Sequence, residues 1–180
     1  MSENAITVVE LSLDPAGARE RAAEITHWLL ETRIVIPNTN RDELWRPNEY
    51  LAGPNVRTAT KLWSSDDEQL ANNGVDVMVE RMLHHPAGNY MPPACPTCGT
   101  VLDEEAHEGM GDAWLEGPEP LVRCAACGAE ALVGDWPGEW TFHVGELAVS
   151  FSNWPPLNDA FLDDLRTRLG PRTRVVFEHI

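Results

Sequence analysis

Two short segments, CPTCG at residues 95–99 and CAACG at residues 124–128, contain all four cysteines of this 180-residue chain. Each segment places two thiols on one tight turn, and the glycine that follows lets the backbone pass close to the sulfur atoms. Four thiolates suit a tetrahedral ion such as zinc, with Zn–S distances of about 2.3 Å. Because they leave no position for a water molecule, the metal is expected to be structural. The sequence therefore predicts a structural zinc site formed by Cys95, Cys98, Cys124 and Cys127.

The two segments resemble the paired knuckles of a zinc ribbon, whose first knuckle typically reads C-P-x-C-G. The likeness covers residues 92–135, which we expect to form an inserted zinc ribbon. Zinc ribbons serve many functions, so the likeness predicts a metal and not an activity. A four-cysteine iron site fits the same ligands, and sequence alone does not separate it from zinc.

Two other uses of the cysteines fit the sequence less well. A redox-active pair needs a C-x-x-C motif that opens a helix after a strand, whereas Pro92 and Pro93 precede the first knuckle. Structural disulfides suit secreted chains. The first fifteen residues lack the basic and apolar regions of a signal peptide, and no apolar run is long enough to span a membrane. We therefore expect a soluble, cytoplasmic protein that does not interact with membranes.

The charge of the chain argues against nucleic acid as a partner. The formal net charge is −16, which repels phosphate backbones and attracts basic proteins or cations. The residues between the first and last cysteine include one base, Arg123, and seven carboxylates: Asp103, Glu104, Glu105, Glu108, Asp112, Glu116 and Glu119. This acidic ribbon is therefore not expected to bind DNA or RNA.

Alternating hydrophobic residues predict strands on both sides of the cysteines. The predicted strands are residues 6–13, 75–80, 140–144, 147–151 and 173–179, with the third and fourth joined by a turn at Gly145-Glu146. The first strand leads into a helix that is capped by Asp14 and begins at Pro15, with Ala18, Ala22, Ile25 and Leu29 on one face. A second helix carries Phe161, Leu165 and Leu169 and stops at Gly170-Pro171.

This order of elements resembles the ferredoxin-like fold, an α+β sandwich with a βαββαβ plan. It predicts one α+β domain from residues 1–91 and 136–180, with the ribbon at residues 92–135 inserted at the central hairpin. Between the sheet and the helices we expect to find Val9, Leu11, Val77, Val79, Val149, Phe151, Val175 and Phe177. The other face is expected to be partly covered by residues 33–74, with Trp45 and Trp63. For that segment the sequence suggests a strand near residues 56–63 and two short helical turns.

No known catalytic motif occurs in the chain. Polar and aromatic residues in three loops form a candidate ligand or partner surface, and they could also serve only to build turns and anchor loops. The candidates are Asn38, Asn40, Arg41, Trp45, His84, His85, Tyr90, Asn153 and Trp154. The paired knuckles, together with the segment NWPPL at residues 153–157, also resemble a family of small bacterial proteins with no assigned activity.

These features favour an acidic protein with structural zinc that acts by binding. The leading hypothesis is a protein-interaction module, for example an inhibitor or immunity-type partner of a basic protein. The alternative is a small-molecule-binding enzyme that uses the loops rich in Asn, His and Arg. A homo-oligomer is compatible with either hypothesis.

Overall fold

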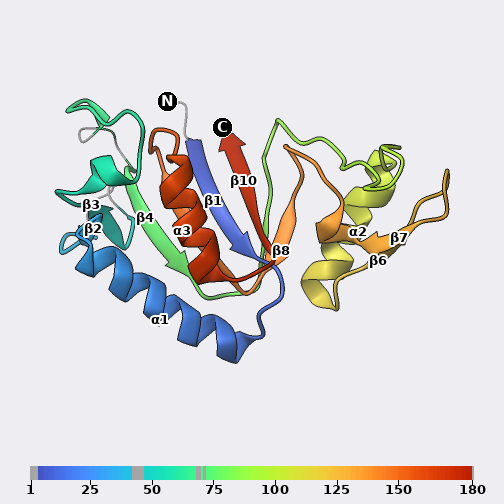
Figure 1. Ribbon diagram of the computed structural model, residues 1–180, viewed down its shortest axis with the longest axis horizontal. Coiled ribbons are helices and arrows are strands. Elements are labelled where there is room, and N and C mark those ends of the chain that lie inside the picture. The colour runs from blue at the N-terminus through green and yellow to red at the C-terminus, as the bar shows by residue number, and fades with distance from the viewer. Residues whose placement is uncertain (1–3, 42–46, 68–69, 71, 180) are drawn as a thin grey trace.

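The computed structural model describes residues 4–41, 47–67, 70 and 72–179, and its largest element is an antiparallel sheet of six strands. The strands lie in the order β10-β1-β9-β4-β3-β2, and each neighbouring pair is antiparallel. Their bounds are β1 (Asn4–Glu10), β2 (Val35–Pro37), β3 (Tyr50–Ala52), β4 (Gly74–Met78), β9 (Leu147–Ser152) and β10 (Thr173–His179). The start of β1 and the end of β10 lie side by side at one edge of the molecule (Figure 1).

The first helix, α1 (Pro15–Glu31), begins as the sequence predicts. Asp14 Oδ1 accepts a hydrogen bond from Gly17 N at 2.7 Å, and Pro15 occupies the first turn, where its missing N–H costs nothing. The helix places on its buried face the four predicted residues Ala18, Ala22, Ile25 and Leu29. These four residues recur with the period of a helix, about 3.6 residues per turn. They therefore form a single apolar stripe that packs on the sheet.

The last helix, α3 (Asp159–Leu169), has a matching cap. Asn158 Oδ1 accepts a hydrogen bond from Phe161 N at 2.7 Å. The helix ends at Gly170, whose φ of 148° is a conformation that favours glycine. Its buried residues are Phe161, Leu165 and Leu169, as predicted.

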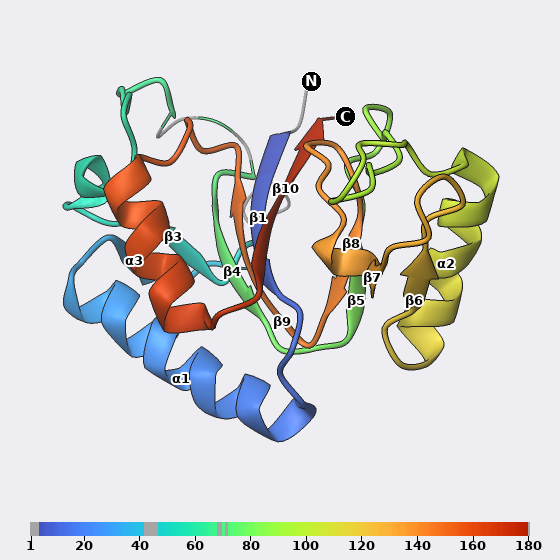
Figure 2. The ribbon, with the colours of Figure 1, turned by 45° about the vertical axis from the view of Figure 1, so that its right-hand side comes forward.

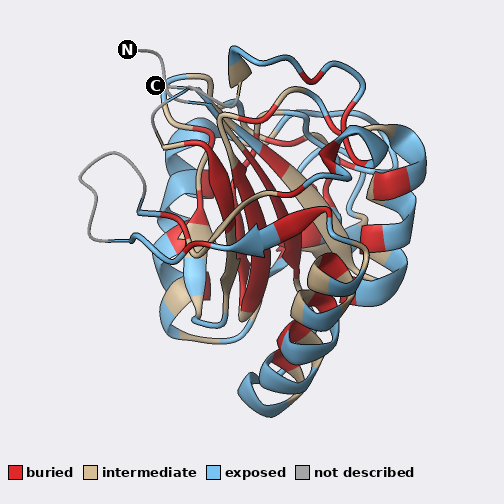
Figure 3. Cartoon of the chain, turned by 90° about the vertical axis from the view of Figure 1, so that its left-hand side faces the viewer, coloured by how far each residue is buried: buried red, intermediate tan, exposed pale blue. Residues whose placement is uncertain are grey.

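Helices α1 and α3 both lie on the same face of the sheet, as Figure 2 shows. Trp28 of α1 stacks on Phe161 of α3, with ring centroids 5.5 Å apart. Sheet residues Val8, Val149 and Phe151 are fully buried beneath them. Burial of this apolar surface is the main stabilising contribution to the layer, and Figure 3 shows the central strands as its most buried part.

The segment between β4 and β9, residues 79–146, is called the insert below. It contains two short antiparallel pairs, β5 with β8 and β6 with β7, and one helix. Its elements are β5 (Met82–His84), α2 (Glu104–Glu116), β6 (Leu121–Arg123), β7 (Glu130–Leu132), the 3-10 helix η3 (Val133–Asp135) and β8 (His143–Gly145). The insert lies on the face of the sheet opposite to α1 and α3 (Figure 2).

The predicted hairpin between residues 140–144 and 147–151 is wrong. Strand β8 pairs with β5, whereas β9 pairs with β1 and β4. Gly145 is the reason, because a Cβ there would lie 2.5 Å from Glu10 O and 2.6 Å from Val9 Cγ1. The glycine that suggested a turn instead allows β8 to cross β1 at close range.

The predicted strand near residues 56–63 is also wrong, since Val56–Thr58 forms the 3-10 helix η1. The segment 33–74 instead contributes β2 and β3, which extend the sheet beyond β4. One predicted helical turn, around residues 41–45, falls mostly outside the described residues. No helix among the described residues combines the length and apolarity that crossing a bilayer requires.

The face of one strand, β1, differs from the prediction. In β1 it is Val8 that contacts the helices, whereas Val9 lies on the opposite face with Ala148 and Val176. Leu11 joins that opposite cluster and the core of the insert. The run Ile6 to Val9 is apolar at three of four positions, so its alternation does not identify the face.

Two residues expected in the core are exposed, Val79 at 40% and Phe177 at 37% of their surface. Val79 follows the end of β4, and Phe177 lies near the end of the edge strand β10, beyond the cover of α3. The insert, not residues 33–74, covers the second face of the sheet. Trp63 packs in the core on the helix side, and Trp45 lies outside the described residues.

Candidate metal centre

The four cysteine sulfur atoms converge at one point of the insert. The four Sγ atoms all lie within 4.8 Å of one another. Cys95 Sγ is 3.8 Å from Cys127 Sγ, and Cys98 Sγ is 3.6 Å from Cys124 Sγ. A tetrahedral ion with Zn–S bonds of about 2.3 Å needs S···S separations of about 3.8 Å. All four cysteines are free thiols, so each is available to bind a metal.

The first knuckle is a turn closed by backbone hydrogen bonds. Gly99 N donates to Cys95 O at 2.9 Å, and Cys95 N donates to Thr100 O at 2.8 Å. Gly99 has a φ of 73°, which residues with a side chain adopt only at a cost. The backbone N–H of Thr97 also points to Cys95 Sγ at 3.4 Å, as expected for a metal-binding thiolate.

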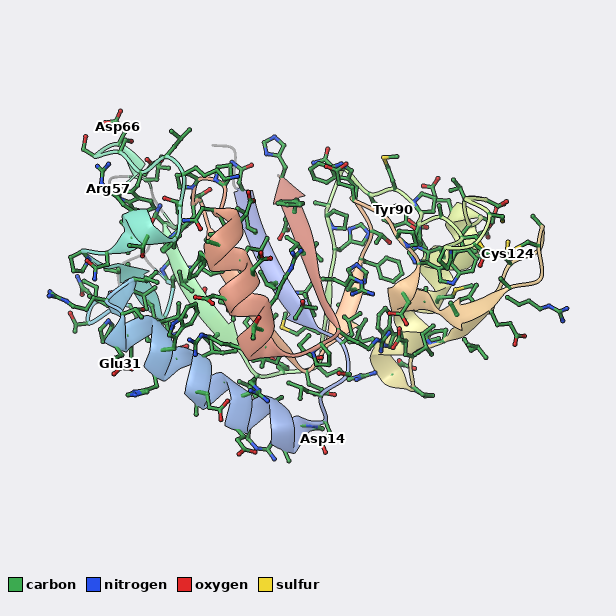
Figure 4. All side chains as sticks on the ribbon, in the orientation of Figure 1. Asp14, Glu31, Arg57, Asp66, Tyr90 and Cys124 are labelled. Atoms are coloured by element: carbon green, nitrogen blue, oxygen red, sulfur yellow. The ribbon has the colours of Figure 1, made fainter. Side chains whose placement is uncertain are left out.

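The second knuckle repeats the same geometry at the tip of the hairpin formed by β6 and β7. Gly128 N donates to Cys124 O at 2.9 Å, and Cys124 N donates to Ala129 O at 2.8 Å. Gly128 has a φ of 76°. Two turns of identical construction thus face one another and present two sulfur atoms each, and Figure 4 shows Cys124 at the end of the molecule formed by the insert.

The polar surroundings favour a thiolate at the exposed position 98. The Thr100 hydroxyl lies 3.2 Å from Cys98 Sγ. Together with the backbone of Thr100, it lowers the pKa of the Cys98 thiol to about 6. A thiolate is the form that binds metal ions.

The metal centre is part of a second hydrophobic core, distinct from the one between sheet and helices. Cys95 and Cys124 are buried, at 2% and 3% exposure, and belong to a cluster that also contains Trp114, Trp136, Val122, Val133, Phe142 and Val144. We call this cluster the insert core. A metal held by the cysteines would therefore link both knuckles to the packing of α2 and β8.

Arg81 fixes the C-terminal end of α2. Its Nη2 donates to Trp114 O and Gly117 O, both at 2.6 Å, and its Nε donates to Leu115 O at 2.9 Å. Carbonyl groups at a helix C-terminus lack partners within the helix, so these bonds satisfy them. Arg81 also pairs with Glu146 at 3.0 Å, which joins α2 to the end of the insert.

Two arginines near the start of β10 attach the insert to the sheet. Arg172 binds Glu119 through two hydrogen bonds of 2.8 and 3.0 Å and Asp135 at 3.0 Å. The hydrogen bonds with Glu119 raise the pKa of Arg172 above its ordinary value. Arg174 donates to Asp135 at 2.8 Å and to Gly134 O at 2.8 Å. This network is partly buried, where bidentate arginine pairs are strongest.

The candidates His85 and Tyr90 belong to an aromatic stack in the insert. The His85 ring lies 5.1 Å from Tyr90, and His107 lies 4.2 Å from Phe142. The Tyr90 hydroxyl is 2.6 Å from His107 Nδ1. Burial, followed by the charge of Glu108, raises the pKa of Tyr90 to about 12, and burial lowers the pKa of His107 to about 4.

The candidate His84 lies opposite His143 in the pair of strands β5 and β8. Both imidazoles are buried, at 8% and 3% exposure. Burial lowers the pKa of His84 to about 4 and that of His143 to about 3. His84 Nε2 and His143 Nδ1 have no hydrogen-bond partner among the described residues. At neutral pH these two histidines are therefore uncharged residues of the interior.

Among the candidates in the loop after β2, Asn38 forms hydrogen bonds that shape the loop. Asn38 Nδ2 donates to Asn48 O at 2.9 Å, and Asn38 Oδ1 accepts from Asn40 N at 3.0 Å. Such bonds shape a turn. Asn40 and Arg41 are exposed, and Trp45 lies outside the described residues.

The candidates Asn153 and Trp154 line a cavity of about 960 Å³ at the ends of β1 and β10. Residues 33–74 contact Trp154, because Trp63 packs against it with ring centroids 5.3 Å apart. The described candidates thus occupy three places: the loop after β2, the insert, and this cavity. Of them, only Asn153 and Trp154 line the cavity.

The roles of several residues of these sites could not be predicted from local patterns in the sequence. Arg81, Arg172 and Arg174 are scattered basic residues whose partners named above lie 33 to 65 positions away in the chain. Trp63 and Trp140 lie outside the helices and strands of the structure, and no local pattern in the sequence brings them to one cavity.

Comparisons with protein families, with curated proteins and with solved structures find no match for this chain. The four-cysteine cluster and the surfaces around it are therefore the basis for the function proposed next.

Proposed function

We propose that this chain is a structural-zinc protein that acts by binding another protein. The observation that carries the metal assignment is the position of the four Sγ atoms, all within 4.8 Å of one another on two matching knuckles. Four thiolates complete a tetrahedral zinc site, so the ion has no open position and its role is to hold the insert together. Iron would suit the same ligands, and elemental analysis separates the two metals.

The proposal includes a fold assignment. The strands β1, β4, β9 and β10 with helices α1 and α3 form a ferredoxin-like βαββαβ core, and a zinc ribbon is inserted at its central hairpin. The order β10-β1-β9-β4 and the placement of both helices on one face support this assignment. The inserted unit is centred on residues 92–135, and it extends to residues 79–146 because β5 pairs with β8 and both contact α2.

The surface of α2 supports a basic protein as the partner. Its exposed residues include the carboxylates Glu104, Glu105, Glu108, Asp112 and Glu116, and the helix contains no lysine or arginine. Four of them follow one another at four-residue spacing, where like charges destabilise a helix by a few tenths of a kcal/mol per pair. No ion pair among the described residues includes these five side chains. A basic partner would relieve this repulsion, whereas a nucleic acid would increase it.

The test compares two variants with the same change in charge. One carries Glu104→Gln, Glu105→Gln, Glu108→Gln and Asp112→Asn on α2. The control carries Glu20→Gln, Glu24→Gln, Asp163→Asn and Asp164→Asn at exposed positions of α1 and α3. Immobilised wild type and control should retain the same basic protein from cell extract at low salt and release it at high salt.

The α2 variant should lose that protein by roughly tenfold or more, since four charge-assisted contacts are removed. Equal retention by the α2 variant, or retention of acidic rather than basic proteins by the wild type, would contradict the proposed role of α2.

A further inference from the structure

A cavity of about 960 Å³ lies away from the cysteines and has no part in the function proposed above. The ends of β1 and β10 form its floor, with Ile6 and Phe177 among the lining residues. One wall comes from residues 62–67 and 153–156, and the other from Asn89 and Trp140 of the insert. Asp66 and Tyr90, which are labelled in Figure 4, are next in sequence to the lining residues Asp67 and Asn89. They lie on either side of the ends of β1 and β10.

The lining of this cavity is largely aromatic and apolar. It includes Trp63, Trp140, Trp154, Phe177, Leu62, Leu70, Pro155 and Pro156. Leu62 is 74% exposed and Leu70 is 46% exposed, and Phe177 is exposed at 37%. Exposure of apolar surface to water is unfavourable. Several exposed apolar residues around one cavity therefore indicate a binding site, whereas single scattered ones do not.

The aromatic walls are held in place by contacts of the rings with one another and with Phe151. Trp154 packs edge-on against both Trp63 and Phe151, at 5.3 and 5.2 Å between ring centroids. Trp140 packs on Phe177 at 5.9 Å. Because these contacts already position the rings, ligand binding should lose little conformational entropy in ordering them.

The polar groups of the cavity indicate the charge of the ligand. Its lining contains neither lysine nor arginine, and its polar side chains include the carboxylates Asp67 and Glu178, the amides of Asn4, Asn89 and Asn153, and the imidazole of His179. Asp67 Oδ2 is occupied by the Ser64 backbone N–H and hydroxyl, at 2.6 and 2.7 Å. Glu178 forms no ion pair among the described residues and also borders an adjacent cavity of about 200 Å³.

We propose that this cavity binds a small aromatic or aliphatic ligand that carries a protonated amine, with the ammonium group next to Glu178. The faces of tryptophan and phenylalanine rings attract cations, and the carboxylate adds a charge-assisted hydrogen bond. A ligand carboxylate or phosphate would find neither lysine nor arginine in the lining and would be repelled by a chain of net charge −16. The volume of about 960 Å³ suits a drug-sized molecule.

Three compounds that share a phenylbutyl group test this proposal: 4-phenylbutylamine, 4-phenylbutanol and 5-phenylpentanoate. Their binding to the full chain is followed by tryptophan fluorescence and by chemical-shift changes in NMR spectra, up to millimolar concentration. The amine should bind roughly tenfold more tightly than the alcohol, and the carboxylate should bind most weakly. Phe177→Ala should weaken the amine and the alcohol alike.

Glu178→Gln should remove the advantage of the amine and leave the affinity for the alcohol unchanged. Glu130→Gln is the matched control, because Glu130 is an exposed carboxylate of β7 that does not line the cavity. Saturable binding of the amine that is unaffected by Glu178→Gln would overturn the position of the ammonium group. Equal binding of all three compounds, tighter binding of the carboxylate, or no saturable binding would overturn the proposed ligand class. None of these outcomes depends on the carboxylates of α2, so this test and the test of the proposed function fail independently.

Discussion

Single residues already determine the metal centre. The four cysteines, and the glycines that follow each pair, are sufficient to predict both knuckles, because a left-handed residue after the second thiol is a local requirement. The helix caps at Asp14 and Asn158 are local in the same way, although only the first was predicted. The faces of Val8 and Val9 were not predictable, since both neighbours are apolar and the two sides of β1 are both covered.

At this scale the first prediction is that Cys98→Ser weakens metal binding and lowers the melting temperature. Removing one metal ligand reduces the free energy of metal binding, and this free energy contributes to the stability of the folded chain. For a chain of this length, a loss of about 3 kcal/mol corresponds to a decrease of roughly 6–12 °C. Thermal unfolding and metal content are measured on the same samples.

Thr97→Ser is the control for Cys98→Ser, because Thr97 lies in the same knuckle and only its backbone N–H contacts a cysteine sulfur. An unchanged melting temperature and metal content in Cys98→Ser would show that the cysteines do not hold a structural metal.

At the scale of elements, local patterns predict where strands and helices occur better than which strands pair. Residues 140–144 and 147–151 read as a hairpin, yet β8 pairs with β5, which precedes it by about sixty residues. That pairing places His84 opposite His143 in the interior of the insert, and no local pattern in the sequence encodes it. The same elements yield a prediction about pH.

The three buried histidines His84, His107 and His143 should remain neutral in the folded protein well below pH 6.5. Burial lowers the pKa of His84 and His107 to about 4 and that of His143 to about 3. The unfolded chain therefore takes up these protons first as the pH falls. Above about pH 6.5 these histidines should not lower the free energy of unfolding. From there toward pH 4 the free energy of unfolding should decrease, by at most about 1.4 kcal/mol per pH unit for each imidazole.

NMR titration of the imidazole signals checks this directly. The signals of the three buried histidines should not move between pH 7 and about pH 5. His27, whose side chain is 78% exposed, gives a solvent-exposed reference in the same spectra. Protonation of His84 or His143 near pH 6.5 in the folded protein would contradict the buried, uncharged state assigned to them.

At the scale of the whole molecule, the sheet separates two hydrophobic cores. One lies beneath α1 and α3, and the other lies in the insert around Cys95 and Cys124. The order of elements and the position of the cysteine segments between two strands could be predicted, because each depends on local patterns. The cover of the second face could not, since it depends on contacts such as Arg172 with Glu119, 53 positions apart.

We expect one zinc ion to occupy the four-cysteine centre and to stabilise the insert. Native mass spectrometry of the full chain, purified under reducing conditions without added metal, measures whether the ion is bound. The expected result is one zinc per chain, with four reactive thiols appearing only after the metal is removed by acid or a chelator. A chain without bound metal, or with the mass of one or two disulfides, would contradict the claim.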